Sequence, residues 1–207
     1  SVFNMEARRF EFQKGPVFAQ VVLIDEINRA PAKTQAALFE VMEERQITYD
    51  GVRHAMKAPF FVVATQNPIE QEGTYRLPEA QLDRFLFRIK MGYPGLADEE
   101  ALLRRFKDNF RAQEPDAVEP VLDAATLLAC QAMVERVHAT DALCAYIAAI
   151  VHATRDHGSL YLGASPRASL GILKASKAMA LMEGRDYVLP EDVQAAALPV
   201  LNHRILL

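Results

Sequence analysis

The sequence predicts an α/β domain followed by an all-helical domain. Two apolar runs, at 20–24 and 60–65, stop abruptly at polar residues, which predicts strands of a parallel sheet that are buried on both faces. A Gly-Tyr-Pro-Gly segment at 92–95 is typical of a linker. Beyond it, apolar residues recur at helical spacing. We therefore expect a partial parallel sheet with helices over residues 1–93 and an α-helical domain over residues 96–207.

Turn and strand signals are concentrated in the first part. The opening residues have β-leaning runs at 1–3 and 9–12, which predict a short hairpin. Asp50-Gly51 lies between two further β-leaning runs and favours a type I′ turn, because both central residues of that turn need a positive φ. A short apolar run at 86–89 predicts a third strand of the sheet.

Helices are predicted on both sides of the linker. Before it, apolar residues at i, i+1, i+4 and i+5 from Ala37 lie on one helical face, which predicts a helix from about Pro31. After it, Ser165-Pro166 places a capping hydroxyl before a proline, which favours a helix start. The five helices expected there span 97–111, 123–137, 141–156, 166–183 and 190–203.

The composition limits the class of protein. Apolar residues make up 51% of the 207-residue chain, which supports a packed core. The net charge of −4 argues against nucleic acid as a partner. Two cysteines, Cys130 and Cys144, cannot form a disulfide framework or a four-ligand zinc site. Because the sequence has no apolar run of membrane-spanning length and no signal-peptide pattern, we expect a cytoplasmic protein.

Asp25-Glu26 is the first candidate site. Adjacent carboxylates at the carboxyl end of a buried strand lie where α/β sheets bind ligands. The two side chains point in different directions, so one can hold a metal ion while the other orients or deprotonates water. The alternative is an ordinary strand exit with both acids in solvent.

Three further candidates follow in the chain. Asn67 ends a polar trio after the second apolar run, which suits either a phosphate or water contact or a plain turn before Pro68. Arg84 offers a planar set of donors for phosphate, with an ion pair to a neighbouring acid, Asp83 or Glu79, as the alternative. Arg167 lies in the first turn of a predicted helix, where the dipole disfavours a cation, and this suggests an anionic partner.

Other chemistries find little support in the sequence. The five histidines form no His-Glu-x-x-His pattern of a zinc protease. No Gly-x-Ser-x-Gly pattern of an α/β hydrolase occurs.

Five motifs, in order along the chain, resemble the MoxR family of AAA+ ATPases. They include Val-Val-Leu-Ile-Asp-Glu-Ile-Asn-Arg-Ala-Pro and Ser-Pro-Arg-Ala, and together they cover residues 21–31, 33–38, 64–75, 77–85 and 165–168. The resemblance implies a P-loop NTPase core followed by a helical lid. It also implies ATP and Mg²⁺ as cofactors and a homo-oligomeric, hexameric ring.

The resemblance assigns a role to each candidate residue. Asp25 resembles the Walker B aspartate that holds Mg²⁺, and Glu26 resembles the catalytic glutamate that polarises water. Asn67 resembles the sensor 1 residue that reads the γ-phosphate. Arg84 resembles the arginine finger that acts on ATP bound by a neighbouring subunit, and Arg167 resembles the sensor 2 arginine of the lid.

Two further segments match the family, and one motif is absent. The stretch to Phe18 resembles the end of the helix 2 insert, and the Asp50-Gly51 hairpin resembles the pre-sensor 1 hairpin. Gly-x-x-x-x-Gly-Lys-[Ser/Thr] does not occur in the sequence, so the backbone amides and lysine that cradle phosphates are missing. We therefore expect the carboxyl-terminal part of such a protein, inactive toward ATP by itself.

The family implies chaperone-like, ATP-driven remodelling of partner proteins, often with von Willebrand A domain proteins and metal-cofactor insertion. One alternative is a non-catalytic oligomerisation or regulatory module, which the missing P-loop favours. Another is an AAA+ remodeller of nucleic acid, against which the acidic balance argues.

Overall fold

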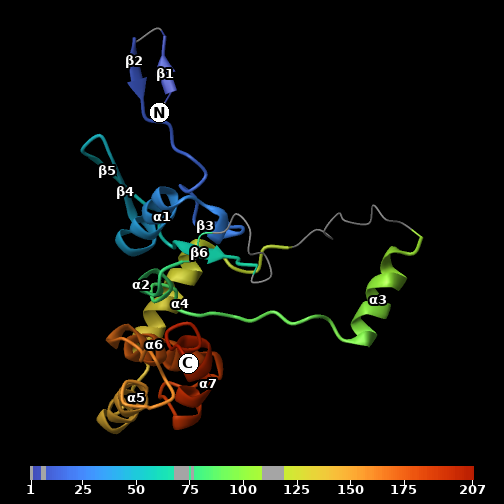
Figure 1. Cartoon of the computed structure of the whole chain (residues 1–207), viewed down its shortest axis with the longest axis vertical. Helices are drawn as coiled ribbons and strands as arrows, with labels where there is room; N and C mark the ends of the chain where they lie inside the picture. Colours follow the sequence, from blue (N-terminus) through green and yellow to red (C-terminus); the bar gives the residue numbers. More distant parts are fainter. Residues whose placement is uncertain (1, 6–7, 68–74, 76, 109–118) are drawn as a thin grey trace.

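The computed structural model describes residues 2–5, 8–67, 75, 77–108 and 119–207. Every strand that it describes precedes residue 65, and five of its helices, α3 to α7, follow residue 95. Figure 1 shows the strands and α1 at one end of the molecule and α5, α6 and α7 packed together at the other. The expected α/β fold class is therefore confirmed. We call the described residues up to 85 the α/β part, which contains β1 to α2, and those from 96 onward the helical part, which contains α3 to α7.

The α/β part contains three two-stranded sheets. β3 (Val21–Ile24) and β6 (Phe61–Ala64) are parallel neighbours, as the two apolar runs predicted, so their carboxyl ends share one edge. Two antiparallel hairpins are formed by β1 (Val2–Asn4) with β2 (Arg9–Glu11), and by β4 (Gln46–Tyr49) with β5 (Val52–Ala55). In the second hairpin Asp50 and Gly51 have φ of 49° and 75°, which confirms the predicted turn.

The expectation that both apolar runs are buried on two faces is wrong for this structure. Val21 and Leu23 of β3 are 66% and 67% exposed, and Phe61 of β6 is 62% exposed. The cause is the sheet's size, because side chains alternate across a strand and only one face of β3 and β6 is covered. On that covered face Ile24 and Ala64 pack against the cluster of Ile27, Phe39 and Leu77.

Helix α1 (Ala32–Glu44) begins directly after Pro31, as the proline signal predicted. A 3-10 turn, η1 (Ile27–Arg29), precedes it. The buried face of α1 agrees with the expected one at Val41, which is buried, and at Leu38 and Met42, which are partly buried. It differs in that Ala37 is exposed and Phe39 is buried. Phe39 meets Phe85 edge to face, with ring centroids 6.1 Å apart. A one-turn helix, α2 (Glu79–Leu82), precedes Phe85.

The predicted strand at 86–89 does not form. Its backbone groups bond to the helical part instead: the Arg88 amide donates to Pro199 O at 3.0 Å, and Asn202 Nδ2 donates to Arg88 O at 2.9 Å. These hydrogen bonds use backbone groups that a neighbouring strand would otherwise bind, so the segment does not join the sheet. It connects the α/β part to the helical part instead.

The helical part confirms the five predicted helices, with ends that differ by a few residues. α3 (Leu96–Phe106) stands apart from the other elements in Figure 1 and buries no residue. The part of the expected 97–111 helix beyond residue 108 lies outside the described residues. The remaining helices are α4 (Ala124–Arg136), α5 (Asp141–Ala153), α6 (Pro166–Met182) and α7 (Pro190–Leu201).

The helical core forms where α6 packs against α5 and α7. Ala168, Ile172 and Ala175 of α6 are buried at helical spacing against Val193 and Val200 of α7. Gly171 allows the close approach, because a Cβ there would lie 3.2 Å from a Val200 methyl carbon. In the part of the chain that is described, no helix is both long and apolar enough to cross a membrane.

A buried arginine joins the two parts. Arg204, just after α7, is 7% exposed and donates from Nε to Asp83 Oδ1 at 2.8 Å. It also donates to the carbonyl oxygens of Asp83, Phe85 and Leu86. Burial lowers the pKa of Arg204, and the hydrogen bond to Asp83 opposes that shift. Ser165, the residue that caps α6, donates to the other Asp83 oxygen at 2.8 Å. One carboxylate of the α/β part thus binds both the start of α6 and the segment just after α7.

Candidate functional site

The two candidate acids lie at the carboxyl edge of the β3–β6 pair. Asp25 and Glu26 follow the last residue of β3, and Thr65 follows the last residue of β6. The Thr65 hydroxyl donates to Asp25 Oδ1 at 2.5 Å and accepts a hydrogen bond from the Glu26 amide at 2.9 Å. The carboxylate of Asp25 and the backbone of Glu26 are therefore oriented by one side chain on the neighbouring strand.

Glu26 has a backbone conformation that residues other than glycine rarely adopt. Its φ of 48° and ψ of 54° lie in the left-handed region, where a residue with a Cβ is strained. The turn redirects the chain from β3 into η1, and Ile27 then donates to Thr65 O at 3.1 Å. The Glu26 carboxylate forms an ion pair with Arg29 Nε at 2.9 Å.

Asn67 lies at the same edge as the acids, because it follows β6 and β6 runs parallel to β3. Its side chain is exposed, and residues 68–74 of the same motif lie outside the described residues. Among the described residues no three His, Cys, Asp or Glu side chains come together as a metal cage. A single carboxylate such as Asp25 instead fits Mg²⁺, which binds one or two protein carboxylates together with phosphates and water.

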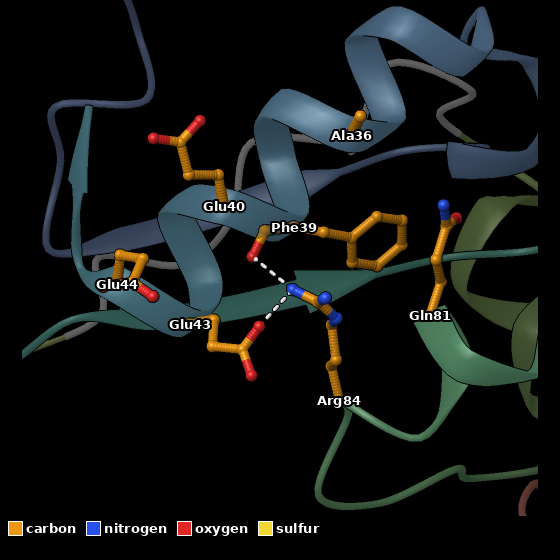
Figure 2. A pocket seen from close by; sticks show the side chains of 7 residues that line it. All are labelled: Ala36, Phe39, Glu40, Glu43, Glu44, Gln81 and Arg84. Carbon is orange, nitrogen blue, oxygen red and sulfur yellow. Dashed lines mark hydrogen bonds and ion pairs between the residues drawn. The ribbon is translucent and has the colours of Figure 1, made fainter. Parts of the chain in front are cut away.

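The two candidate arginines lie together at a different place. Glu43, near the carboxyl end of α1, forms ion pairs with Arg84 and with Arg167, one through each carboxylate oxygen. Arg84 Nη1 also donates to Phe39 O at 3.4 Å, as Figure 2 shows. Asp83, one of the expected alternative partners of Arg84, is bound by Arg204 instead.

Helix α1 separates the arginine pair from the acids. Gln35, in the first turn of α1, donates to Ile27 O at 3.3 Å and so ties that end of the helix to the strand edge. Glu43 lies more than two turns further along, which corresponds to a rise of about 12 Å. The structure thus divides the candidate residues into an acidic group (Asp25, Glu26 and Asn67) and an arginine group (Arg84 and Arg167).

Sequence reasoning missed the residues that orient these groups. The sequence pattern marks Thr65 only as one of a polar trio, and no local pattern marks Glu43 or Arg204. Helical spacing could have pointed to Glu43 as a solvent-side acid of α1, but its partner Arg167 is 124 residues away in the chain. Such long-range pairs leave no signal in local sequence patterns.

Comparison with known families identifies both parts of the chain. Residues 1–87 match the family described as "ATPase family associated with various cellular activities (AAA)". Residues 152–206 match the family described as "AAA lid domain". Each match includes one of the two arginines of the arginine group.

The sequence is similar over its whole length to two longer curated proteins. It is 46% identical over 207 residues to YeaC of Bacillus subtilis strain 168, which is described as uncharacterized, and spans 64% of that protein. It is 43% identical over 215 residues to "Chaperone MoxR1" of Mycobacterium tuberculosis H37Rv and spans 56% of it.

A solved structure of a candidate ATPase from Cytophaga hutchinsonii agrees with this family. It superimposes with a TM-score of 0.87 at 39% identity, covering 99% of this chain and 64% of its own. The chain therefore spans less than two thirds of the length of these relatives, and it belongs to the MoxR family of AAA+ ATPases.

Proposed function

We propose that this chain works within a longer protein that assembles into a ring. That protein responds to the nucleotide it binds and hydrolyses ATP to remodel partner proteins. The observation that carries the proposal is the division into an acidic group and an arginine group. Asp25 lies at the strand edge to which the first turn of α1 is tied, whereas Arg84 of the same chain binds Phe39 O and Glu43 further along α1. The arrangement suits a nucleotide bound between subunits, with acids from one copy and arginines from the next.

Each group supplies a different part of the chemistry. Asp25, whose carboxylate accepts a hydrogen bond from Thr65, holds Mg²⁺ in this proposal, and Glu26 orients or deprotonates the attacking water. Asn67 offers an amide to the γ-phosphate. Arg84 and Arg167 stabilise negative charge that develops on the transferred group. ATP supplies the activated phosphoryl group.

The protein partners follow from the family. We propose a cytoplasmic homo-oligomer, a hexameric ring, that acts as a chaperone on other proteins. The relative named "Chaperone MoxR1" supports the chaperone role. More specifically, we propose that its partners include proteins with von Willebrand A domains and that it takes part in metal-cofactor insertion.

A second candidate function concerns the chain by itself. The sequence has no Gly-x-x-x-x-Gly-Lys-[Ser/Thr] pattern, so these residues alone have no phosphate cradle. Under this second candidate function, the chain by itself is a non-catalytic oligomerisation or regulatory module. Its melting temperature should then be unchanged by millimolar ATP, because a ligand that binds only the native state must stabilise it. A rise of several degrees would exclude this candidate.

Replacement of Glu26 in the whole protein tests the first proposal. Glu26→Gln should bind ATP but lose turnover by a factor of about 10²–10⁴, because the amide keeps the shape and loses the base. Nucleotide binding and phosphate release are measured on the same preparation. Glu44→Gln, an exposed acid of α1, is the matched control and should keep wild-type turnover. Full activity of Glu26→Gln would remove Glu26 from the mechanism.

A further inference from the structure

Glu43 joins three segments that are distant in the chain. Its Oε2 contacts Arg84 Nη1, in the segment after α2, and its Oε1 contacts Arg167 Nη2, in the first turn of α6. The Asp83–Ser165–Arg204 contacts beside it hold the same two parts of the protein together. Glu43 therefore lies where the α/β part meets the helical part.

The contact with Glu43 leaves most of each guanidinium group available. An arginine has five N–H donors, and Glu43 engages one nitrogen of each. The side chains of Arg84 and Arg167 are 31% and 48% exposed. Figure 2 shows Arg84 Nη1 directed toward Glu43 and the Phe39 carbonyl, with its other two nitrogens on the far side of the group. A second anion can thus bind while Glu43 stays in place.

The arrangement borders a pocket. It has a volume of about 320 Å³ and opens between α1 and the segment at 81–84. Its lining consists of Ala36, Phe39, Glu40, Glu43, Glu44, Gln81 and Arg84. Of its three acids, Glu43 alone forms an ion pair among the residues that the structure describes. Glu40 is thus a chemically matched neighbour of Glu43 in the same pocket.

Electrostatics explains why a carboxylate is needed between the arginines. Two guanidinium cations repel each other, and a carboxylate between them adds two attractions that offset this repulsion. Exposed ion pairs add only about 0–1 kcal/mol to folding stability. Glu43 therefore matters for the position of the two arginines far more than for folding.

We propose that Glu43 is a positioning residue whose carboxylate holds Arg84 and Arg167 side by side, so that both meet the phosphates of one nucleotide. The inference rests on the proposed ATPase function. Glu43 itself touches no substrate and acts only through the two arginines.

Kinetics of the whole protein test the proposal. Glu43→Gln should lower kcat by about 10–10²-fold, the cost expected of a misplaced catalytic group, with a smaller change in KM for ATP. Glu40→Gln should leave both constants unchanged. A rise in activity in Glu43→Gln would overturn the proposal, because Glu43 would then restrain the arginines rather than position them. Equal activity of the two variants would overturn it as well.

Subunit mixing distinguishes positioning from a general structural defect. Rings mixed from Glu43→Gln and Glu26→Gln should regain activity, since some interfaces pair an intact acid group with an intact arginine group. Rings mixed from Glu43→Gln and Arg84→Ala should not, because both lesions lie in the arginine group. Rescue in the second mixture would contradict the proposal.

A measurement without nucleotide separates this inference from the ATPase proposal. Phenylglyoxal modifies arginines, and mass spectrometry reports modification at each position of the unliganded whole protein. In Glu43→Gln, phenylglyoxal should modify both Arg84 and Arg167 more than in the wild type, because neither arginine is then protected by its ion pair. In Glu40→Gln, the modification of both arginines should be unchanged. Unchanged protection would overturn the role of Glu43 even if ATP hydrolysis is confirmed. An inactive wild type with the expected protection change would instead count against the ATPase proposal alone.

Discussion

The hydroxyl of Thr65 donates a hydrogen bond of 2.5 Å to the carboxylate of Asp25 across two parallel strands. Every other polar group of Thr65 bonds to the same neighbouring segment. Its amide donates to Ile24 O, its carbonyl accepts from Ile27, and its hydroxyl accepts from Glu26. Thr65 thus fixes the end of β3 at the point where the chain turns into a left-handed conformation.

Thr65→Val should therefore impair Mg²⁺-dependent ATP turnover of the whole protein. Valine keeps the shape but cannot donate to Asp25, and the loss of such an orienting bond typically costs about 10–100-fold in metal affinity or activity. Thr65→Ser, which keeps the hydroxyl, should retain most of the activity. Titration of turnover with Mg²⁺ measures the effect, and identical curves for valine and threonine would refute it.

Arg204→Met should destabilise this chain strongly. Methionine leaves the Asp83 carboxylate without its arginine, and removing one partner of a buried pair costs about 3–5 kcal/mol. Arg104→Met provides the control, because its ion pair with Glu100 is exposed and should contribute about 0–1 kcal/mol. Urea unfolding of the three proteins measures the difference. A loss in Arg204→Met no larger than the control would show that the contact contributes little.

His203 should make the stability of the chain depend on pH. Burial lowers the pKa of His203 from 6.5 to about 4, although its hydrogen bond to Phe85 O opposes the shift. Between these two values the unfolded chain binds more protons than the folded chain, so the free energy of unfolding falls as the pH falls through this window. The shift corresponds to about 3 kcal/mol.

His203→Gln tests this assignment, because glutamine can still donate to Phe85 O but does not titrate. Urea unfolding between pH 4.5 and 7 should give a flatter pH dependence for the variant than for the wild type. The pKa of Asp192 is also lowered from the ordinary aspartate value of 3.8, mainly by its hydrogen bond to Arg185, so its contribution to stability changes below this window. Parallel curves would show that His203 is not the titrating group.

Local signals in the sequence predicted the parts of the fold that local forces decide. Asp50-Gly51 needs positive φ at both residues, and the hairpin has it. Ser165 caps α6 as expected, with its hydroxyl accepting from the Arg167 amide at 3.1 Å. The order of strands, the turn and the helices therefore followed from residue type and spacing.

Long-range contacts decided the rest. The run at 86–89 has strand-like residues, but Asn202 and Pro199 bind its backbone from the helical part. The candidate arginines were found from the sequence, whereas their common partner, Glu43, was not. No local pattern encodes a carboxylate whose partners lie in two other segments.

The last prediction concerns Arg84 and the subunit on which it acts. If Arg84 serves a neighbour's nucleotide, it completes a site whose acids belong to another copy. Such an arginine contributes about 10³–10⁵ in turnover, because it meets charge that develops only in the transition state. Arg84→Ala and Glu26→Gln of the whole protein should each be nearly inactive when assembled alone.

Mixed rings of these two variants should regain part of the activity. Some of their interfaces pair the intact Glu26 of an Arg84→Ala subunit with the intact Arg84 of a Glu26→Gln subunit. If Arg84 acts within its own subunit, no interface gains a complete site, and mixed rings that are shown to form will stay inactive. If Arg84 is only a surface partner of Glu43, the single variant keeps most of its turnover, because an exposed ion pair is worth about 0–1 kcal/mol. Turnover of the two variants, alone and mixed, therefore separates action in trans, action in cis and a purely structural ion pair.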